Sequence, residues 1–220
     1  MELQFVATPE KGEVSALLLR PAEASHLLVL GHGASSNMRH PMLQTIAERL
    51  AEVGIATLRY NFPYMQHGRG RDSAAVCTVT VRSAVAAAGR AAPDLALLAG
   101  GHSFGGRMTS TAASEAPIEG VRGLVFFSFP LHPAGEPGIQ RAAHLSAVAV
   151  PMLFLSGTRD ALAELDLLRP VCQKLERATL HLLDTADHGF RTLKRSRQSE
   201  VDVFVEMAAV VRDWSQALPA

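Results

Sequence analysis

The sequence predicts an α/β fold, in which a mostly parallel, doubly wound sheet carries helices on both faces and a minimal cap or none. Apolar strand-like segments alternate with helical ones along the chain, and this alternation is typical of a parallel sheet. Leu27–Leu30 and Leu124–Phe127 are apolar throughout, as expected of strands that are buried on both faces. No large insertion interrupts the alternation, so the chain holds little material for a cap.

The first half of the chain is expected to begin with a hairpin and to continue with strands that are each followed by a helix. Leu3–Val6 and Val14–Leu19 are short apolar strands, and the short connection between them favours an antiparallel hairpin. Asn61–Asp72 is expected to be a loop. The other predicted elements are strands His26–Leu30, Ile55–Tyr60 and Leu95–Ala99 and helices Met42–Val53, Ser73–Ala91 and Arg107–Ser114.

The second half continues the alternation as far as a long amphipathic helix. Pro170 is expected to interrupt the first helix of this half, because proline lacks the amide that a helix interior uses. Phe129–His144 is the only stretch that could roof a site. The predicted elements are strands Gly123–Ser128, Met152–Ser156 and Thr179–Leu183 and helices Leu162–Leu175 and Glu200–Leu218.

Length and composition predict one domain over residues 1–220 and exclude several function classes. Lys+Arg and Asp+Glu both number 21, so the basic excess of a general nucleic-acid binder is missing. No run of about 18 apolar residues predicts a membrane span, and the N-terminal segment does not resemble a signal peptide. We therefore expect a cytoplasmic protein, in which Cys77 and Cys172 are two buried thiols.

The most informative stretch is Leu95–Gly106, where an apolar strand ends in Gly-Gly-His-Ser-Phe-Gly-Gly and a helical pattern follows. Gly101–Gly105 fits Gly-x-Ser-x-Gly, the pentapeptide of a nucleophile elbow, in which a serine occupies a strained strand-to-helix turn. Small neighbours are required there because a β-carbon would collide with the strand or the helix. The pattern therefore predicts that Ser103 is a nucleophile.

A phosphate-binding P-loop is the rival interpretation of the same glycines. Gly101 and Gly106 have its spacing, but Arg107 and Met108 occupy the positions of its lysine and its hydroxyl residue. Without a hydroxyl group there is no magnesium ligand, so we reject this interpretation.

Two further candidates follow strands, as Ser103 does. Asp160 comes after the predicted strand Met152–Ser156, and His188 comes after Thr179–Leu183. In a parallel sheet such loops gather at the carboxyl ends of the strands, where ligands bind. A serine needs a base to remove its proton, and the base needs a carboxylate to orient it. We therefore predict a catalytic triad of these three residues.

The polar residues of these loops also have structural interpretations. Asp160 could instead cap the helix that follows it. Asp184 and Asp187 are interpreted as turn or capping residues, which aspartate favours. His32 is interpreted as a structural loop residue, and His102 as the variable position of the pentapeptide.

An oxyanion hole of this type uses two backbone amides. One is expected from Phe104, the residue after the nucleophile. The other is expected from the Gly31–Ala34 loop after the first parallel strand, with Ala34 as the choice and Ser35 as the alternative. No cofactor and no metal are expected.

These motifs make the chain resemble the α/β-hydrolase superfamily, and within it the small lidless hydrolases related to dienelactone hydrolases and the KANL3/Tex30-type hydrolase-like domain. The order Ser, Asp, His along the chain is that of the superfamily. Dienelactone hydrolases proper use a cysteine nucleophile, so their particular chemistry does not transfer to Ser103. The segments that carry the resemblance are Gly31–Ala34, Asn61–Met65, Gly101–Arg107, Phe129–Pro133 and Gly157–Asp160.

The resemblance implies a serine hydrolase, and the lack of material for a cap favours small carboxylic esters or thioesters, cleaved through an acyl-enzyme. Two alternatives stay open. Some relatives of the narrower group serve as protein-interaction scaffolds, and a peptidase or amidase could use the same triad, since fold does not separate ester from amide cleavage. The expected partner is a small-molecule ester, with neither nucleic acid nor membrane; the oligomeric state stays open.

A run of basic residues closely follows His188 in the sequence. It is interpreted either as a solvated basic face or as a set in which one residue attracts an anionic substrate. The residues are Arg191, Lys194, Arg195 and Arg197.

Overall fold

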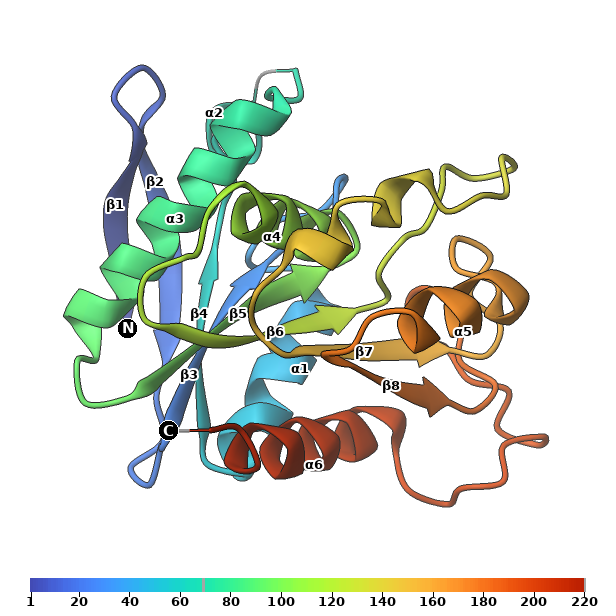
Figure 1. Cartoon of the computed structure of the whole chain (residues 1–220). Helices are drawn as coiled ribbons and strands as arrows, with labels where there is room; N and C mark the ends of the chain where they lie inside the picture. The colour runs from blue at the N-terminus through green and yellow to red at the C-terminus, as the bar shows by residue number, and fades with distance from the viewer. Residues whose placement is uncertain (69, 220) are drawn as a thin grey trace.

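One sheet of eight strands runs through the part of the chain that the computed structural model describes, residues 1–68 and 70–219 (Figure 1). Arg69, in the predicted loop Asn61–Asp72, and Ala220 lie outside the described residues. The strand order is β1-β2-β4-β3-β5-β6-β7-β8. β2 pairs antiparallel with β1 and β4, and every other pair is parallel, so the predicted mostly parallel sheet is confirmed. The strands are β1 (Glu2–Thr8), β2 (Gly12–Leu19), β3 (His26–Gly31), β4 (Ile55–Tyr60), β5 (Ala96–His102), β6 (Val121–Phe127), β7 (Met152–Gly157) and β8 (Ala178–Leu183).

Helices cover both faces of the sheet, which confirms the doubly wound architecture (Figure 1). α1 and α6 pack side by side on one face, where their apolar side chains share a buried cluster with β3 and β7. α3, α4 and α5 contribute to a second buried cluster on the other face. The helices are α1 (Pro41–Glu52), α2 (Pro63–His67), α3 (Ala74–Ala91), α4 (Phe104–Glu115), α5 (Leu165–Gln173) and α6 (Val203–Gln216).

Three of these helices begin at a polar side chain that accepts a hydrogen bond from the first turn. His40 Nδ1 accepts from the Met42 amide at 3.3 Å at the start of α1. Ser73 precedes α3 and Asp202 precedes α6, and each accepts in the same way from amides of the first turn. These caps satisfy amides that have no partner inside the helix.

Two predictions from the sequence are wrong: the start of the helix after Ser103, and the assignment of Asn61–Asp72 as a loop throughout. α4 begins at Phe104, directly after Ser103, and not at Arg107. Gly105 and Gly106 weaken the helical pattern in the sequence, yet they lie inside the first turn of α4 because the space there admits only glycine. The predicted loop Asn61–Asp72 contains the short helix α2, which begins with a proline at its first position.

Pro170 does not interrupt α5, contrary to the prediction. The helix runs through it from Leu165 to Gln173. The amide that proline lacks would have bonded to the carbonyl of Asp166, one turn earlier. Both residues are exposed, so water can satisfy that carbonyl and the helix continues.

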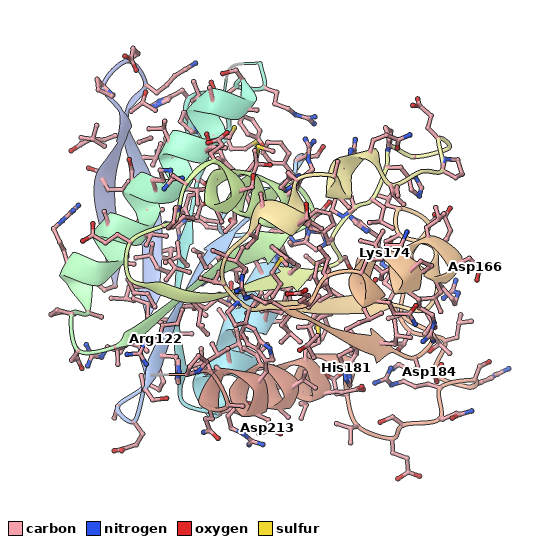
Figure 2. All side chains as sticks on the ribbon, viewed as in Figure 1. Arg122, Asp166, Lys174, His181, Asp184 and Asp213 are labelled. Carbon is pink, nitrogen blue, oxygen red and sulfur yellow. The ribbon has the colours of Figure 1, made fainter. Side chains whose placement is uncertain are left out.

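Most of the buried side chains are apolar, and the two cysteines are among them. Cys77 and Cys172 are free and buried, as predicted, and burial raises the pKa of each thiol to about 12. Neither thiol is therefore ionised at neutral pH. Exposed charged residues labelled in Figure 2 are Arg122, Asp166, Lys174 and Asp213.

Candidate active site

Ser103 occupies the sharp junction between β5 and α4, with φ of 51° and ψ of −110°. A positive φ is strained for a residue that carries a β-carbon. The amide of Ser103 donates to the Phe127 carbonyl at the end of β6, at 3.0 Å, which holds the turn against the sheet. The backbone therefore forms the strained turn that the pentapeptide predicts.

The glycines of the pentapeptide are required by the close approach of this turn to the end of β3. A β-carbon on Gly105 would lie 2.4 Å from the carbonyl carbon of Gly31, and one on Gly101 would lie 2.5 Å from the carbonyl oxygen of the same residue. A larger residue at either position would push β3 away from the elbow. It would also move Ser103 relative to the loop that follows β3.

The structure brings Ser103, His188 and Asp160 together. His188 Nε2 lies 2.9 Å from Ser103 Oγ, and His188 Nδ1 lies 2.9 Å from each carboxylate oxygen of Asp160. The Asp160 side chain is fully buried, whereas 25% of the His188 side chain is exposed. When Nδ1 carries the ring proton and donates to the carboxylate, Nε2 is free to accept the serine proton.

The loops that carry Asp160 and His188 touch directly. A β-carbon on Gly157, at the end of β7, would lie 2.2 Å from the Ala186 carbonyl oxygen in the loop after β8. Asp160 Oδ1 also accepts from the Leu162 amide at 2.9 Å. Because α5 begins only at Leu165, this second bond closes a turn, and Asp160 does not cap the helix.

The contacts of His32 agree with a structural role. The side chain is buried, its Nδ1 donates to the Gly33 carbonyl at 2.7 Å, and its Nε2 accepts from the Phe62 amide at 3.1 Å. Burial lowers the pKa of His32 to about 4. The ring therefore stays neutral and ties the loop after β3 to the loop after β4.

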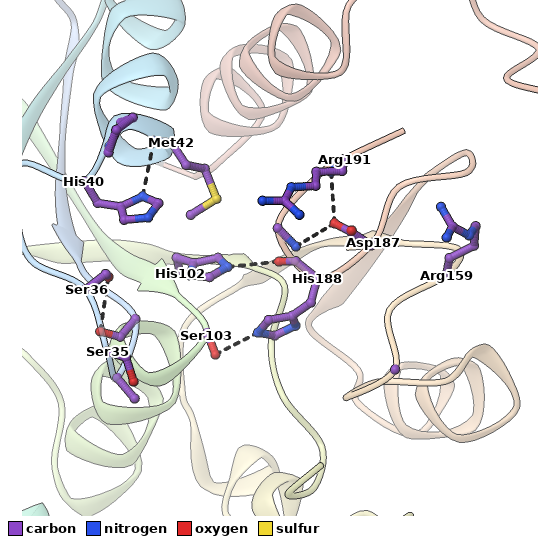
Figure 3. Close-up of a pocket in the computed structure, with 15 residues that line it drawn as sticks. Ser35, Ser36, His40, Met42, His102, Ser103, Arg159, Asp187, His188 and Arg191 are labelled. Atoms are coloured by element: carbon purple, nitrogen blue, oxygen red, sulfur yellow. Dashed lines mark hydrogen bonds between the residues drawn. The ribbon is translucent and has the colours of Figure 1, made fainter. Parts of the chain in front are cut away.

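His102 makes a contact that its variable position in the pentapeptide did not reveal. Its Nε2 lies 3.0 Å from the backbone carbonyl oxygen of His188, to which it donates, and the two rings lie 5.2 Å apart (Figure 3). Burial lowers the pKa of His102 to about 4, so this ring is also neutral at neutral pH. The elbow thus holds the backbone of His188 as well as its side chain.

The loop that contains Ala34 and Ser35 is held in place at its carbonyl groups. The Gly33 carbonyl accepts from the amide and the hydroxyl of Ser36, at 3.1 and 3.2 Å. The Tyr64 hydroxyl donates to the Ala34 carbonyl at 2.9 Å. These hydrogen bonds fix the conformation of the turn after β3.

Two of the amides expected to form the oxyanion hole have no intramolecular acceptor. Within residues 1–68 and 70–219, neither the Ala34 amide nor the Phe104 amide makes a hydrogen bond. Ala34 and Ser103 line the same pocket, and Phe104 follows the serine directly. In the described structure both amides are therefore without an intramolecular acceptor and free to donate to a bound group.

Asp184 and Asp187 make the turn contacts that the sequence indicated. One oxygen of Asp187 accepts from the amides of Gly189 and Arg191, each at 2.9 Å. Asp184 accepts from the Gln198 amide at 2.9 Å. Both carboxylates thus order the chain around His188, and neither contacts its imidazole.

A pocket of about 750 Å³ opens beside Ser103 (Figure 3). It lies between the loop after β3, the start of α1 and the loops after β7 and β8. Within the described residues, no part of Phe129–His144 lines it, so this segment does not roof the pocket. The side chains labelled around it are Ser35, Ser36, His40, Met42, His102, Arg159, Asp187, His188 and Arg191.

His40 and Met42 are pocket residues that reasoning from the sequence missed. They belong to the start of α1, and only the packing of α1 against the sheet brings them near Ser103. Their signal in the sequence is that of an ordinary helix start.

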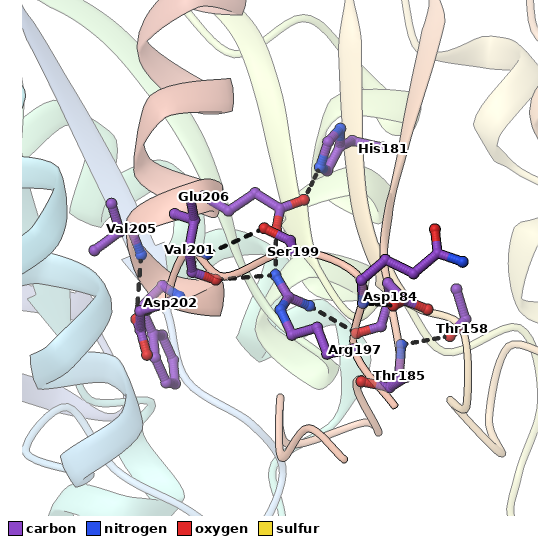
Figure 4. A network of polar contacts seen from close by, with 12 residues as sticks. Thr158, His181, Asp184, Thr185, Arg197, Ser199, Val201, Asp202, Val205 and Glu206 are labelled. Atoms are coloured by element: carbon purple, nitrogen blue, oxygen red, sulfur yellow. Dashed lines mark hydrogen bonds and ion pairs between the residues drawn. The ribbon is translucent and has the colours of Figure 1, made fainter. Parts of the chain in front are cut away.

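The basic residues after His188 differ in their surroundings. Arg191 is exposed and lines the pocket. Arg197 instead donates to the Asp184 carbonyl at 2.7 Å and pairs with Glu206, which also contacts His181 (Figure 4). Arg197 is therefore committed to joining the loop after β8 to α6, and only Arg191 of this set faces the candidate site.

Features of a metal site or a membrane span are missing from the described part of the chain. Among residues 1–68 and 70–219, no group of three or more His, Cys, Asp or Glu side chains is placed to hold a metal ion. No helix in the same residues is long and apolar enough to cross a membrane.

Comparison with known proteins identifies the family. A family profile described as an alpha/beta hydrolase domain matches residues 24–216 of the chain. The chain belongs to this alpha/beta hydrolase family. The match includes every residue of the candidate site, from the loop after β3 to the loop after β8.

Solved structures agree with this family at the level of the fold. Dienelactone hydrolase from Anabaena variabilis matches with a TM-score of 0.76 and 20% identity, over 100% of this chain and 99% of its own. A serine hydrolase without a lid from Xanthomonas campestris matches with a TM-score of 0.74 and 19% identity, over 100% and 95%. A serine hydrolase homologue from Coxiella burnetii matches with a TM-score of 0.75 and 17% identity, over 97% and 96%. These structures, each at most 20% identical to the chain, show that it has the same fold as they do.

Proposed function

We propose that this hydrolase cleaves small carboxylic esters or thioesters through a covalent acyl-enzyme, with Ser103 as nucleophile, His188 as base and Asp160 as its orienting carboxylate. The observation that carries the proposal is the continuous chain of 2.9 Å contacts from Ser103 Oγ through His188 to Asp160. A hydroxyl alone is a weak nucleophile, and such a chain is the arrangement that activates it.

In the first half of the reaction, Ser103 Oγ forms a bond to the carbonyl carbon of the ester while its proton moves to His188 Nε2. The buried Asp160 carboxylate stabilises the imidazolium that forms. The carbonyl oxygen becomes an oxyanion, for which the Ala34 and Phe104 amides are the proposed donors. Collapse of this intermediate breaks the bond to the leaving oxygen or sulfur, which takes the proton from Nε2.

In the second half, water replaces the leaving group. His188 Nε2 removes a proton from the water, the oxygen of which attacks the acyl carbon. The bond between Ser103 Oγ and the acyl carbon then breaks, and the serine recovers its proton from Nε2. A carboxylic acid leaves, and the enzyme returns to its starting state.

The surroundings of Ser103 support small soluble substrates. The pocket is about 750 Å³, and no part of the described chain forms a lid over it. A long acyl chain would leave much of its apolar surface in water, which gives little binding energy. We expect acetyl and butyryl esters to be cleaved with higher kcat/KM than long-chain esters, and a clear preference for long chains would contradict this.

Reaction with a fluorophosphonate probe, followed by intact-protein mass spectrometry, tests the activated serine. We expect one adduct on the wild type, none on Ser103→Ala and a much slower reaction of His188→Ala. Ser35→Ala is the matched control, because Ser35 also lines the pocket, its hydroxyl makes no hydrogen bond in the described structure, and alanine keeps the backbone amide. No adduct on the wild type would favour a non-catalytic scaffold, and hydrolysis of amides but not esters would favour an amidase.

A further inference from the structure

Two arginine side chains, Arg71 and Arg107, lie over the ring of Phe104 in the nucleophile elbow, and Arg141 lies on the chain segment that follows β6. They come from three separate segments: Arg71 precedes α3, Arg107 lies in α4, and Arg141 lies in a short 3₁₀ helix after β6. We propose that Arg71, Arg107 and Arg141 form a binding site for a dianionic phosphate group carried by the substrate. The inference rests on the proposed function and names its substrate class.

The ring of Phe104 is contacted by the first two guanidinium groups. The Arg71 Cζ lies 5.5 Å from the centroid of the Phe104 ring, and the Arg107 Cζ lies 5.8 Å from the same centroid. The ring is buried and makes edge contacts with Phe62 and Tyr64, so its position is fixed. Since Phe104 follows Ser103 directly, two positive charges are held beside the proposed oxyanion donor.

Arg107 is placed toward the nucleophile by the geometry of α4. Its amide donates to the Ser103 carbonyl at 3.0 Å, so its backbone is joined directly to that of the nucleophile. Arg141 is oriented by the His132 carbonyl, to which it donates at 2.9 Å. Burial lowers the pKa of Arg107, and the positive charges of Arg141 and Arg71 lower it further.

The protein does not neutralise these charges. In the described structure no carboxylate forms an ion pair with any of the three. Asp72, next to Arg71, is already engaged by Lys11 at 2.6 Å and by the Tyr64 amide at 2.7 Å. The exposed Glu136 offsets part of the charge of Arg141 without contacting it as an ion pair. A cluster of like charges without counterions costs stability, and an anionic ligand would remove that cost.

The number and type of these groups favour phosphate over a carboxylate. A phosphate monoester carries about two negative charges at neutral pH and three acceptor oxygens, whereas a carboxylate carries one charge and two oxygens. One guanidinium group can donate two parallel hydrogen bonds to two phosphate oxygens, and it is weakly hydrated, so arginine suits this ligand. In the reaction above, the phosphate takes no part; the ester bond breaks, and the phosphate holds the leaving group in place.

Calorimetric titration with phenyl phosphate and with benzoate tests the site without any turnover. We expect phenyl phosphate to bind the wild type at least tenfold more tightly than benzoate, and Arg107→Gln and Arg71→Gln each to weaken its binding about tenfold or more, as for loss of a charge-assisted hydrogen bond. Arg122→Gln is the control, because Arg122 is an exposed arginine at the amino end of β6 (Figure 2) and its loss should leave binding unchanged. Equal binding by all four proteins, or no preference over benzoate, would overturn the proposal.

Hydrolysis of 4-acetoxyphenyl phosphate and phenyl acetate then separates this inference from the proposed function. We expect the wild type to cleave the phosphate-bearing ester with higher kcat/KM, and Arg107→Gln to reduce the ratio of the two values at least tenfold. Cleavage of both esters with the same ratio in wild type and variant would reject the phosphate site and leave the esterase intact. If phenyl phosphate binds in an arginine-dependent way but no ester is cleaved, the proposed esterase function is rejected and the phosphate-binding site is retained.

Discussion

His32 and His188 occupy similar places in the fold and have opposite surroundings. Each follows the carboxyl end of a parallel strand, β3 for the former and β8 for the latter. Both ring nitrogens of the buried His32 are bound to backbone groups. The partly exposed His188 instead lies between the hydroxyl of Ser103 and the carboxylate of Asp160.

The partners of these two histidines decide what each can do. His32 has no group from which to take a proton, and burial lowers its pKa to about 4. His188 has a hydroxyl on one nitrogen and a carboxylate to stabilise the charge that proton transfer creates. The first residue is therefore expected to contribute to stability, and the second to chemistry.

Asp160→Asn is expected to have the largest effect, because it changes the partner of His188 and little else. The Asn side chain can still accept from the Leu162 amide, but its amide group would donate to His188 Nδ1 and place the ring proton on Nε2. On the proposed function, kcat for a short-chain ester should fall by about 10⁴-fold. The denaturant midpoint should change little.

Asp187→Asn is the matched control for this substitution. Its carboxylate lies one residue from His188 and accepts only backbone amides, which an asparagine oxygen can also satisfy. Its kcat should stay within a fewfold of the wild type. An equal loss of kcat in the two variants would show that the reaction depends on negative charge near the site and not on the orientation of His188.

The difference between the two histidines could be predicted in part from the sequence. Strand order and the Gly-x-Ser-x-Gly pattern place Ser103, Asp160 and His188 at one edge of the sheet, and the structure brings these three together. Their chemistry is local to loops that follow recognisable strands, which is why a linear pattern could identify them.

The remaining features depend on packing between distant segments. His40 enters the pocket only because α1 packs on the sheet, and Arg141 approaches Arg107 only because the chain after β6 returns over α4. The sequence predicts that α4 begins only at Arg107, yet the two glycines before it lie inside the helix, because a β-carbon would meet Gly31 at the first position and the Gly101 carbonyl at the second. No periodicity in the sequence encodes such contacts between segments.

His32→Leu should reduce stability far more than the loss of an exposed histidine does. It removes the acceptor of the buried Phe62 amide and leaves that amide unsatisfied. We expect the free energy of unfolding at pH 7 to fall by about 2–3 kcal/mol, measured by urea denaturation. His67→Leu, at an exposed histidine on α2, is the control and should change it by less than about 0.5 kcal/mol. Similar values for the two variants would contradict the structural role of His32.

The free energy of unfolding is also expected to fall as the pH is lowered, because His32 is buried in its neutral form. The pKa of His32 is lowered from 6.5 to about 4 by burial, so as the pH falls below 6.5 the unfolded chain binds a proton that the folded protein does not. Stability is therefore lost on acidification, by about 2 kcal/mol per such histidine between pH 7 and pH 5. The free energy of unfolding of His32→Leu should therefore lie closer to that of the wild type at pH 5 than at pH 7, by about 2 kcal/mol. A constant difference across this range would show that His32 binds protons equally in the folded and unfolded protein, so that folding does not lower its pKa.

The smallest expected effect concerns His102, which shares one property with His32 and another with His188. Its pKa is lowered to about 4, as that of His32 is, yet it lines the pocket and its Nε2 donates to the backbone carbonyl of His188 at 3.0 Å. We expect it to be a positioning residue, which acts on the reaction through His188. His102→Leu should lower kcat about tenfold, the value of roughly 1.4 kcal/mol for one hydrogen bond, with KM changed less than twofold. His102→Gln keeps an N–H donor at a similar reach and should recover most of kcat. If both variants lose stability and His102→Gln does not recover kcat, the role of His102 is structural only, like that of His32.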